Sequence, residues 1–108
     1  MRVTSDFWCS AYIRRCHGAG LYALVRRKGE ATAGAIFIVV DRLDRQALLL
    51  GPGPQGGTAD NERVFTVILG PAPEAEIEER LARELRFDPD IWVLAVEDAA
   101  GRHLLDLV

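Results

Sequence analysis

The chain has 108 residues, of which 49% are apolar and 27% charged, and its formal net charge is −3. This length and composition predict a single domain, residues 1–108, that folds around its own core without disulfides or metals. No apolar run approaches the ~20 residues that span a bilayer and the first residues carry no export signal, so a cytoplasmic protein is expected.

The first predicted element is a helix over residues 4–20. At 100° per residue, one broad sector of this helix is apolar and should be buried; it contains Trp8, Cys9, Tyr12, Ile13, Cys16 and Ala19. The Cα atoms of the two cysteines would then lie roughly 10.5 Å apart, beyond the ~7 Å limit of a disulfide. We therefore expect two reduced thiols.

Four strands are predicted next, over residues 21–27, 35–40, 47–50 and 62–69. The run 35–40 is apolar on both faces and rich in β-branched residues, which is typical of a central strand. The short joins between these strands favour antiparallel pairing of neighbours, including a hairpin between the first two. Residues 51–60 form a Gly/Pro-rich loop. It lacks the Gly-Lys-Ser/Thr and following helix of a phosphate-binding loop, so a surface loop is expected.

A second helix is predicted over residues 70–87. Ile77, Leu81 and Leu85 form an apolar stripe along it, while its glutamates gather in the first half and its arginines in the second, which complements the helix dipole. A buried strand follows over residues 91–98, and residues 103–108 are expected to return as a final edge strand.

Asp88, Pro89 and Asp90 separate that helix from the strand of Trp92. The position before a proline is disfavoured in a helix, so we interpret these four residues as structural, with an aspartate capping backbone N–H groups. A second possibility is an ion pair between an aspartate and an arginine of the first helix. A hard metal needs several more oxygen ligands than this segment offers, so neither a metal nor a cofactor is expected.

The predicted order α-β-β-β-β-α-β-β indicates an α+β fold, with two helices packed on one face of an antiparallel or mixed sheet of five to six strands. The centre of the sheet should contain residues 35–40 and 91–96. Helices on one face would leave the other face of residues 91–96 exposed. A symmetric homodimer is the expected way to cover that face.

Charge is divided unevenly along the chain. Residues 1–50 carry eight Lys/Arg and four Asp/Glu, giving +4, whereas residues 51–108 carry five and twelve, giving −7. The basic residues could bind an anion or small ligand together with the Gly/Pro loop, the candidates being Arg14, Arg15, Arg26 and Arg27. Alternatively, the two halves face each other in the fold or across a dimer. Nucleic-acid binding is a weaker alternative, because the overall pI is acidic at about 5.3.

Catalytic motifs are missing from the sequence. It has two histidines, His17 and His103, neither beside a recognisable nucleophile, and its cysteines match no zinc-site spacing. An enzyme is therefore not the expected function, although chemistry by carboxylates alone stays open. The expected function is a small interaction or regulatory module that binds itself or another protein.

Several segments together resemble a family of short bacterial proteins known only as a domain of unknown function. They are the first-helix pattern of Trp8, Ala11, Arg14, Arg15 and Gly20, then "RRKGEATAGAI", "LLGPGPQ" and "RFDPDIWVLAVED". The segment "FDPDIW" is the most specific of these. The resemblance spans nearly the whole chain and implies a stand-alone cytosolic domain, but it brings no catalytic residues with it.

Overall fold

A computed structural model describes residues 3–54 and 63–108 of the chain. It contains two helices and five strands: α1 (Ser5–Gly18), β1 (Tyr22–Arg27), β2 (Ile36–Asp41), β3 (Gln46–Pro52), β4 (Phe65–Pro73), α2 (Glu74–Phe87) and β5 (Trp92–Glu97). The α+β class is as predicted. The Gly/Pro loop predicted at residues 51–60 lies outside the described residues from position 55 onward, and residues 51–52 belong to β3.

The five strands form one mixed sheet in the order β1-β5-β2-β3-β4. β5 runs parallel to β2, and every other neighbouring pair is antiparallel. The predicted hairpin between the first two strands is wrong, because β5 lies between β1 and β2. The prediction that residues 35–40 and 91–96 occupy the middle of the sheet is confirmed, since β2 is the central strand and β5 is its neighbour.

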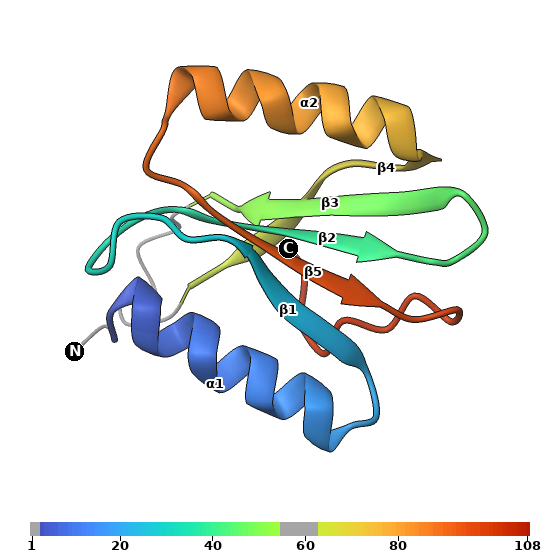
Figure 1. Cartoon of the computed structure of the whole chain (residues 1–108), viewed down its shortest axis with the longest axis horizontal. Coiled ribbons are helices and arrows are strands. Elements are labelled where there is room, and N and C mark those ends of the chain that lie inside the picture. Colours follow the sequence, from blue (N-terminus) through green and yellow to red (C-terminus); the bar gives the residue numbers. More distant parts are fainter. Residues whose placement is uncertain (1–2, 55–62) are drawn as a thin grey trace.

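The two helices lie on opposite sides of the sheet (Figure 1). The core on the α1 side includes Trp92, Leu94 and Val96 of β5, and the core on the α2 side includes Ile91 and Val93. The expectation that both helices share one face is therefore wrong. The cause is the alternation of a strand, which gives β5 an apolar set on each face, and each set is covered by its own helix.

The start of α1 is capped, because the Thr4 hydroxyl accepts a hydrogen bond from the Phe7 N–H at 3.2 Å. Cys9, Tyr12 and Cys16 form the buried stripe of the helix. Both cysteines are free thiols, and burial raises the pKa of Cys9 to about 12 and that of Cys16 above its ordinary value. Such protonated, enclosed thiols behave as small apolar groups.

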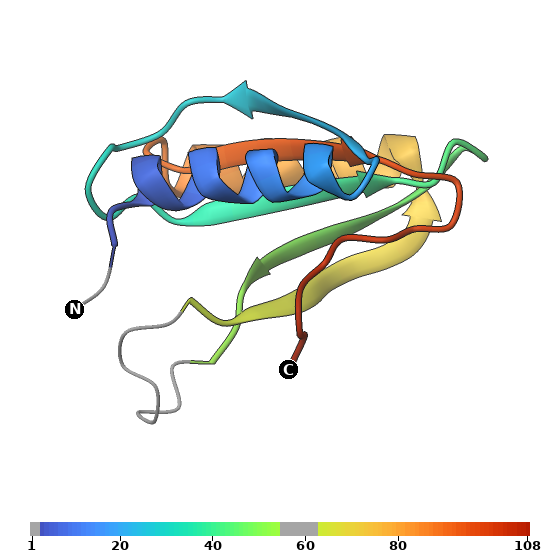
Figure 2. The same ribbon diagram turned by 90° about the horizontal axis from the view of Figure 1, so that it is seen from below.

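The last segment of the chain is not the predicted edge strand. It makes one bridge to the sheet, between Phe65 and Leu107, and otherwise lies over the α1 side of the sheet, below α1 in Figure 2. Leu104, Leu105 and Leu107 all pack against the core there, and Leu104 has a φ of 63°. Because two consecutive residues point the same way, the alternation that a strand needs is lost.

Both faces of β5 are thus covered within the chain, which removes the reason given for a dimer across the face of residues 91–96. Ala95 is the one half-buried residue between Trp92 and Val96. It lies on the α2 side of the sheet, next to β1. The surface of the molecule is hollowed beside Ala95.

Candidate functional site

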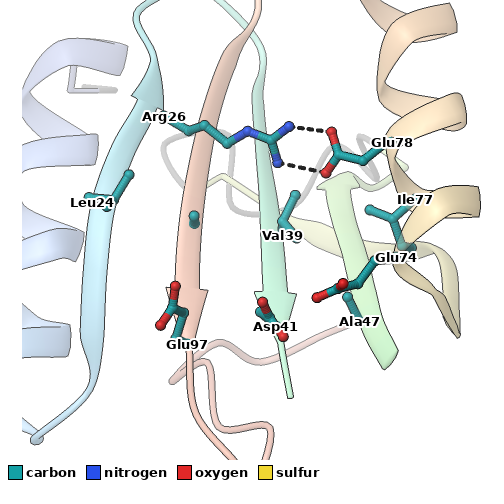
Figure 3. A pocket seen from close by; sticks show the side chains of 10 residues that line it. Leu24, Arg26, Val39, Asp41, Ala47, Glu74, Ile77, Glu78 and Glu97 are labelled. Atoms are coloured by element: carbon teal, nitrogen blue, oxygen red, sulfur yellow. Dashed lines mark hydrogen bonds and ion pairs between the residues drawn. The ribbon is translucent and has the colours of Figure 1, made fainter. Parts of the chain in front are cut away.

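A hollow lies between α2 and β1, with a volume of about 410 Å³ (Figure 3). We call it the acidic cleft. Apolar side chains form much of its wall, and five charged side chains line the rest. Its residues are Leu24, Arg26, Val39, Asp41, Ala47, Glu74, Ile77, Glu78, Ala95 and Glu97. Four carboxylates against one guanidinium give the cleft a formal charge of −3, and its volume lies in the range of small-ligand sites.

Two of the carboxylates occupy the carboxyl ends of the parallel strands. Asp41 ends β2, Glu97 ends β5, and the two residues are direct neighbours in the sheet register. Asp41 also accepts a hydrogen bond from the Leu43 N–H at 2.8 Å, which fixes its position. Crevices at the carboxyl ends of parallel strands are frequent ligand sites. Glu74, the first residue of α2, lies near them in Figure 3.

Arg26 crosses the sheet from β1 to reach Glu78 on α2, as Figure 3 shows. Its guanidinium makes a bidentate ion pair with the carboxylate, with Nη1 donating to Oε2 at 2.9 Å. These hydrogen bonds raise the pKa of Arg26 above its ordinary value. The pair separates the acidic cleft from a second, more apolar hollow between the same two elements, where Leu81, Leu85 and Val93 line the wall.

β1 is an edge strand, and no element lies beyond it in Figure 2. Three of its apolar side chains are exposed: Tyr22 by 59%, Leu24 by 37% and Val25 by 42%. Tyr22 and Leu24 face the α2 side, because they pair with Glu97 and Ala95. Val25 faces the α1 side, where it lines a shallow hollow with Ile13, Arg14 and others. Exposed apolar groups therefore stand on both faces of one open edge.

His17 lies beside this edge. Its Nε2 is 2.9 Å from the carbonyl oxygen of Ala23, and since a carbonyl accepts, the imidazole is the donor. The carbonyl oxygen keeps a second lone pair for another donor. This hydrogen bond holds the end of α1 against β1. Tyr22, Leu24 and Val25 remain exposed.

The four arginines predicted as a binding set lie in two places. Arg14 lines the hollow on the α1 side, and Arg15 donates to the Leu104 carbonyl at 3.0 Å. Arg26 and Arg27 both line the apolar hollow beside α2, because a register irregularity after Val25 turns them to the same side. Only Arg26 lines the acidic cleft. The four side chains do not converge on one pocket.

Asp88 ends α2 with an extended backbone, at φ −140° and ψ 99°. Its Oδ1 accepts a hydrogen bond from the Asp90 N–H at 3.0 Å. The Pro89 carbonyl accepts from Arg27 Nη2 at 2.9 Å. In the part of the chain that the structure describes, the ion pairs include none from either aspartate to an arginine of α1. The turn is held by hydrogen bonds between side chains and backbone groups.

Trp92 connects this turn to the loop between β1 and β2, residues 28–35. The indole Nε1 donates to the Glu30 carbonyl at 2.8 Å, and the Glu30 N–H donates to the Asp90 carbonyl at 2.9 Å. The Glu30 carboxylate accepts from the N–H groups of Thr32 and Ala33, which lowers its pKa. The Asp-Pro-Asp turn and the loop thus form one hydrogen-bonded unit.

Replacing Asp88 by Ala is expected to lower the free energy of unfolding by about 0.5–2 kcal/mol, because the cap on Asp90 is lost. Urea unfolding followed by circular dichroism measures this change. The difference between wild type and variant should be the same with and without EDTA. If EDTA destabilises the wild type but not the variant, Asp88 binds a metal.

Across residues 3–54 and 63–108, no three His, Cys, Asp or Glu side chains lie close enough together to hold a metal ion, so the carboxylates of the acidic cleft do not form a metal cluster. Neither described helix has the length and apolar character to cross a membrane.

The family model described as "Protein of unknown function (DUF1491)" matches residues 3–106. The chain belongs to this family. Its fold is similar to the solution structure of protein Atu0922 from A. tumefaciens, with 41% identity, a TM-score of 0.88, and coverage of 100% of this chain and 96% of that one. No curated protein matches the chain.

Two structures of DUF1491 family proteins from Caulobacter crescentus CB15 are also similar. The crystal structure has 37% identity, a TM-score of 0.80, and coverage of 97% of this chain and 94% of that one. The NMR structure has 38% identity, a TM-score of 0.81, and coverage of 99% and 96%. The resemblance to a bacterial family of unknown function is thereby confirmed.

Sequence reasoning about this DUF1491 chain missed the acidic cleft. Asp41 and Glu97 are far apart in the sequence, and only the parallel pairing of β2 and β5 makes them neighbours. One signal was present: both strands that are apolar on both faces end in a carboxylate. Because strands with two buried faces often pair in parallel, that shared ending indicated a common edge.

Proposed function

We propose that this DUF1491 domain is a non-enzymatic interaction module that binds an extended strand of a partner along the edge of β1. The observation that carries the proposal is the open edge with exposed Tyr22, Leu24 and Val25. An edge strand presents unpaired N–H and C=O groups, and a partner strand can pair with them.

The hollows on either side of β1 support this mode of binding. The acidic cleft and its apolar neighbour lie on the α2 side, and the hollow lined by Val25 and Arg14 lies on the α1 side. In strand addition the main chain supplies affinity, and alternate side chains enter pockets on the two faces. The sequence Tyr22–Val25 also lacks the charges with which edge strands are usually protected.

The proposed module acts in the cytoplasm, where Cys9 and Cys16 stay reduced, and its partner is either a second copy of the chain or another protein. Nucleic-acid binding has less support, because the arginines lie in two separate places and Arg26 is paired with Glu78. The proposal assigns no catalytic residue and no cofactor.

Small-ligand binding is the second candidate, and the volume of the acidic cleft favours it. The ligand would be cationic, because the guanidinium in the cleft is already paired and the carboxylates Asp41, Glu74 and Glu97 remain. Titration with agmatine, followed by NMR, should then shift the amide signals of Asp41 and Glu97. Inorganic phosphate is the comparison: shifts with phosphate at Arg26 would instead support the anion-binding hypothesis.

Two matched variants test the strand-pairing proposal. Val25 on β1 and Val67 on β4 are both 42% exposed and lie on opposite edges of the sheet. Tagged protein is used to capture partners from a native bacterial lysate that also contains an untagged copy. Val25→Lys should lose what the wild type captures, and Val67→Lys should keep it. The proposal is contradicted if the two variants capture their partners equally well. It is also contradicted if the wild type captures nothing, neither another protein nor the untagged copy.

A further inference from the structure

We propose that the strand added to β1 is β1 of a second copy of this chain, in an antiparallel pair around a twofold axis at Leu24. This inference rests on the proposed function and names its partner. Twofold pairing brings the same surface of each copy together, so the β1 edge must be complementary to itself.

Charge provides that complementarity. The basic residues Arg27 and Lys28 lie at the end of β1, next to Arg26, whose charge is paired with Glu78; the beginning of β1, at Tyr22, pairs with Glu97. Asp41 is the next carboxylate across the sheet. An antiparallel pair places the basic end of each copy beside the acidic end of the other, and it does so twice. A parallel pair would place like charges side by side.

The apolar side chains select the register. When Leu24 of one copy lies opposite Leu24 of the other, Ala23 of each copy lies opposite Val25 of the other, and the backbone of Tyr22 lies opposite that of Arg26. Apolar groups then meet at the centre, while the guanidinium of Arg26 stays in its ion pair with Glu78. Directly opposed apolar pairs are the ones that stabilise a sheet.

The layout of the helices leaves room for this pair. In Figure 2, α1 lies inward from β1, in front of β5, and α2 lies on the other side of the sheet, so neither projects beyond the edge. A second copy would extend the sheet from five strands to ten. One strand pair makes a small interface, so dissociation at micromolar concentrations or above is expected.

The test uses opposite charges at the twofold position. Sedimentation velocity from low to high micromolar concentration should show the wild type passing from monomer to dimer, with weaker association in high salt. Leu24→Lys alone and Leu24→Glu alone should each raise the dissociation constant by about tenfold or more, because like charges oppose each other at the axis. An equimolar mixture of the two variants should associate again. Val67→Lys, on the other edge, should dimerise like the wild type.

A thermal melt of each variant checks that the fold is kept, because Leu24 is partly exposed and both substitutions should be tolerated. A wild type that is a monomer at every concentration overturns the dimer, as does a mixture that fails to associate. These outcomes are separate from the proposed function. A monomeric wild type whose capture of another protein is lost in Val25→Lys leaves strand addition standing with a different partner.

Discussion

Trp92→Ala is expected to lower the free energy of unfolding by about 3–5 kcal/mol, the usual cost of removing a large buried aromatic side chain. Trp92 is 1% exposed and belongs to the core on the α1 side. Its indole N–H also holds the carbonyl of Glu30. The substitution therefore leaves a cavity in the core and removes one of the hydrogen bonds between β5 and the loop of residues 28–35. Urea unfolding followed by far-ultraviolet circular dichroism measures the loss.

Trp92→Phe separates the two contributions, because it keeps an aromatic ring and removes the donor. The Glu30 carbonyl keeps the Gly34 N–H as a donor at 3.2 Å, so losing the indole donor should cost about 0.5–1.5 kcal/mol. Phe87→Ala is the matched control: Phe87 is 90% exposed, so its removal should change stability by no more than about 0.5 kcal/mol. A loss below about 1 kcal/mol for Trp92→Ala would show that the indole is not part of the core.

Local signals in the sequence predicted α2 and the turn after it, except that residues 70–73 of the predicted helix belong to β4. The stripe of Ile77 and Leu81 is the buried face of the helix, and the helix ends at Phe87 because Asp88 precedes a proline. These features depend on residues that are only a few positions apart in the sequence, so they can be predicted without knowing what the helix packs against. The central position of residues 35–40 and 91–96 followed in the same way, from apolar side chains on both faces of each run.

Strand order was not contained in local patterns. β5 pairs with β1 on one side and β2 on the other, although long stretches of chain separate them. Period-two alternation tells which face of a strand is buried but not which strand lies beside it. The acidic cleft and the two-sided covering of β5 both follow from this pairing, so both escaped prediction, and the face of residues 91–96 that was expected to be exposed is covered within the chain.

Exposed apolar side chains lie instead at the edge of the sheet, three of them on β1. Apolar side chains from Tyr22 to Val25 were predicted to belong to a strand, and the structure adds that Tyr22, Leu24 and Val25 are exposed at the edge of the sheet. The uneven charge of the two halves of the chain is also seen around this strand. Basic residues of the first half end β1, and carboxylates of both halves line the cleft beside its start.

The segments "RRKGEATAGAI" and "RFDPDIWVLAVED", by which the family was recognised, are packed against each other. The Asp90 carbonyl accepts from the Glu30 N–H, and the Gly34 carbonyl accepts from the hydroxyl of the fully buried Ser5 at 2.6 Å. The loop of residues 28–35 thereby joins the start of α1, the Asp-Pro-Asp turn and Trp92. This unit holds one end of β1, which positions the open edge.

Gly29→Ala is expected to destabilise the protein by about 1–3 kcal/mol, the usual cost of forcing extra atoms into a well-packed region. A Cβ atom at Gly29 would lie 2.6 Å from both the backbone carbon of Ile91 and Cδ1 of Trp92, and closer still to the Asp90 carbonyl oxygen. Two of these three groups are backbone and cannot rotate away, so the loop and the turn must separate. A thermal or urea melt measures the loss.

Gly18→Ala is the matched control. Gly18 is the last residue of α1, and a Cβ there meets nothing within 4 Å. Alanine is the better helix former, so this variant should be neutral or more stable by up to about 1 kcal/mol. If the two variants were equally stable, the loop would be free to move away from the turn. The hydrogen bonds of Glu30 to Asp90 and Trp92 would then contribute little to the fold, and faster amide exchange at Glu30 in Gly29→Ala would show that movement directly.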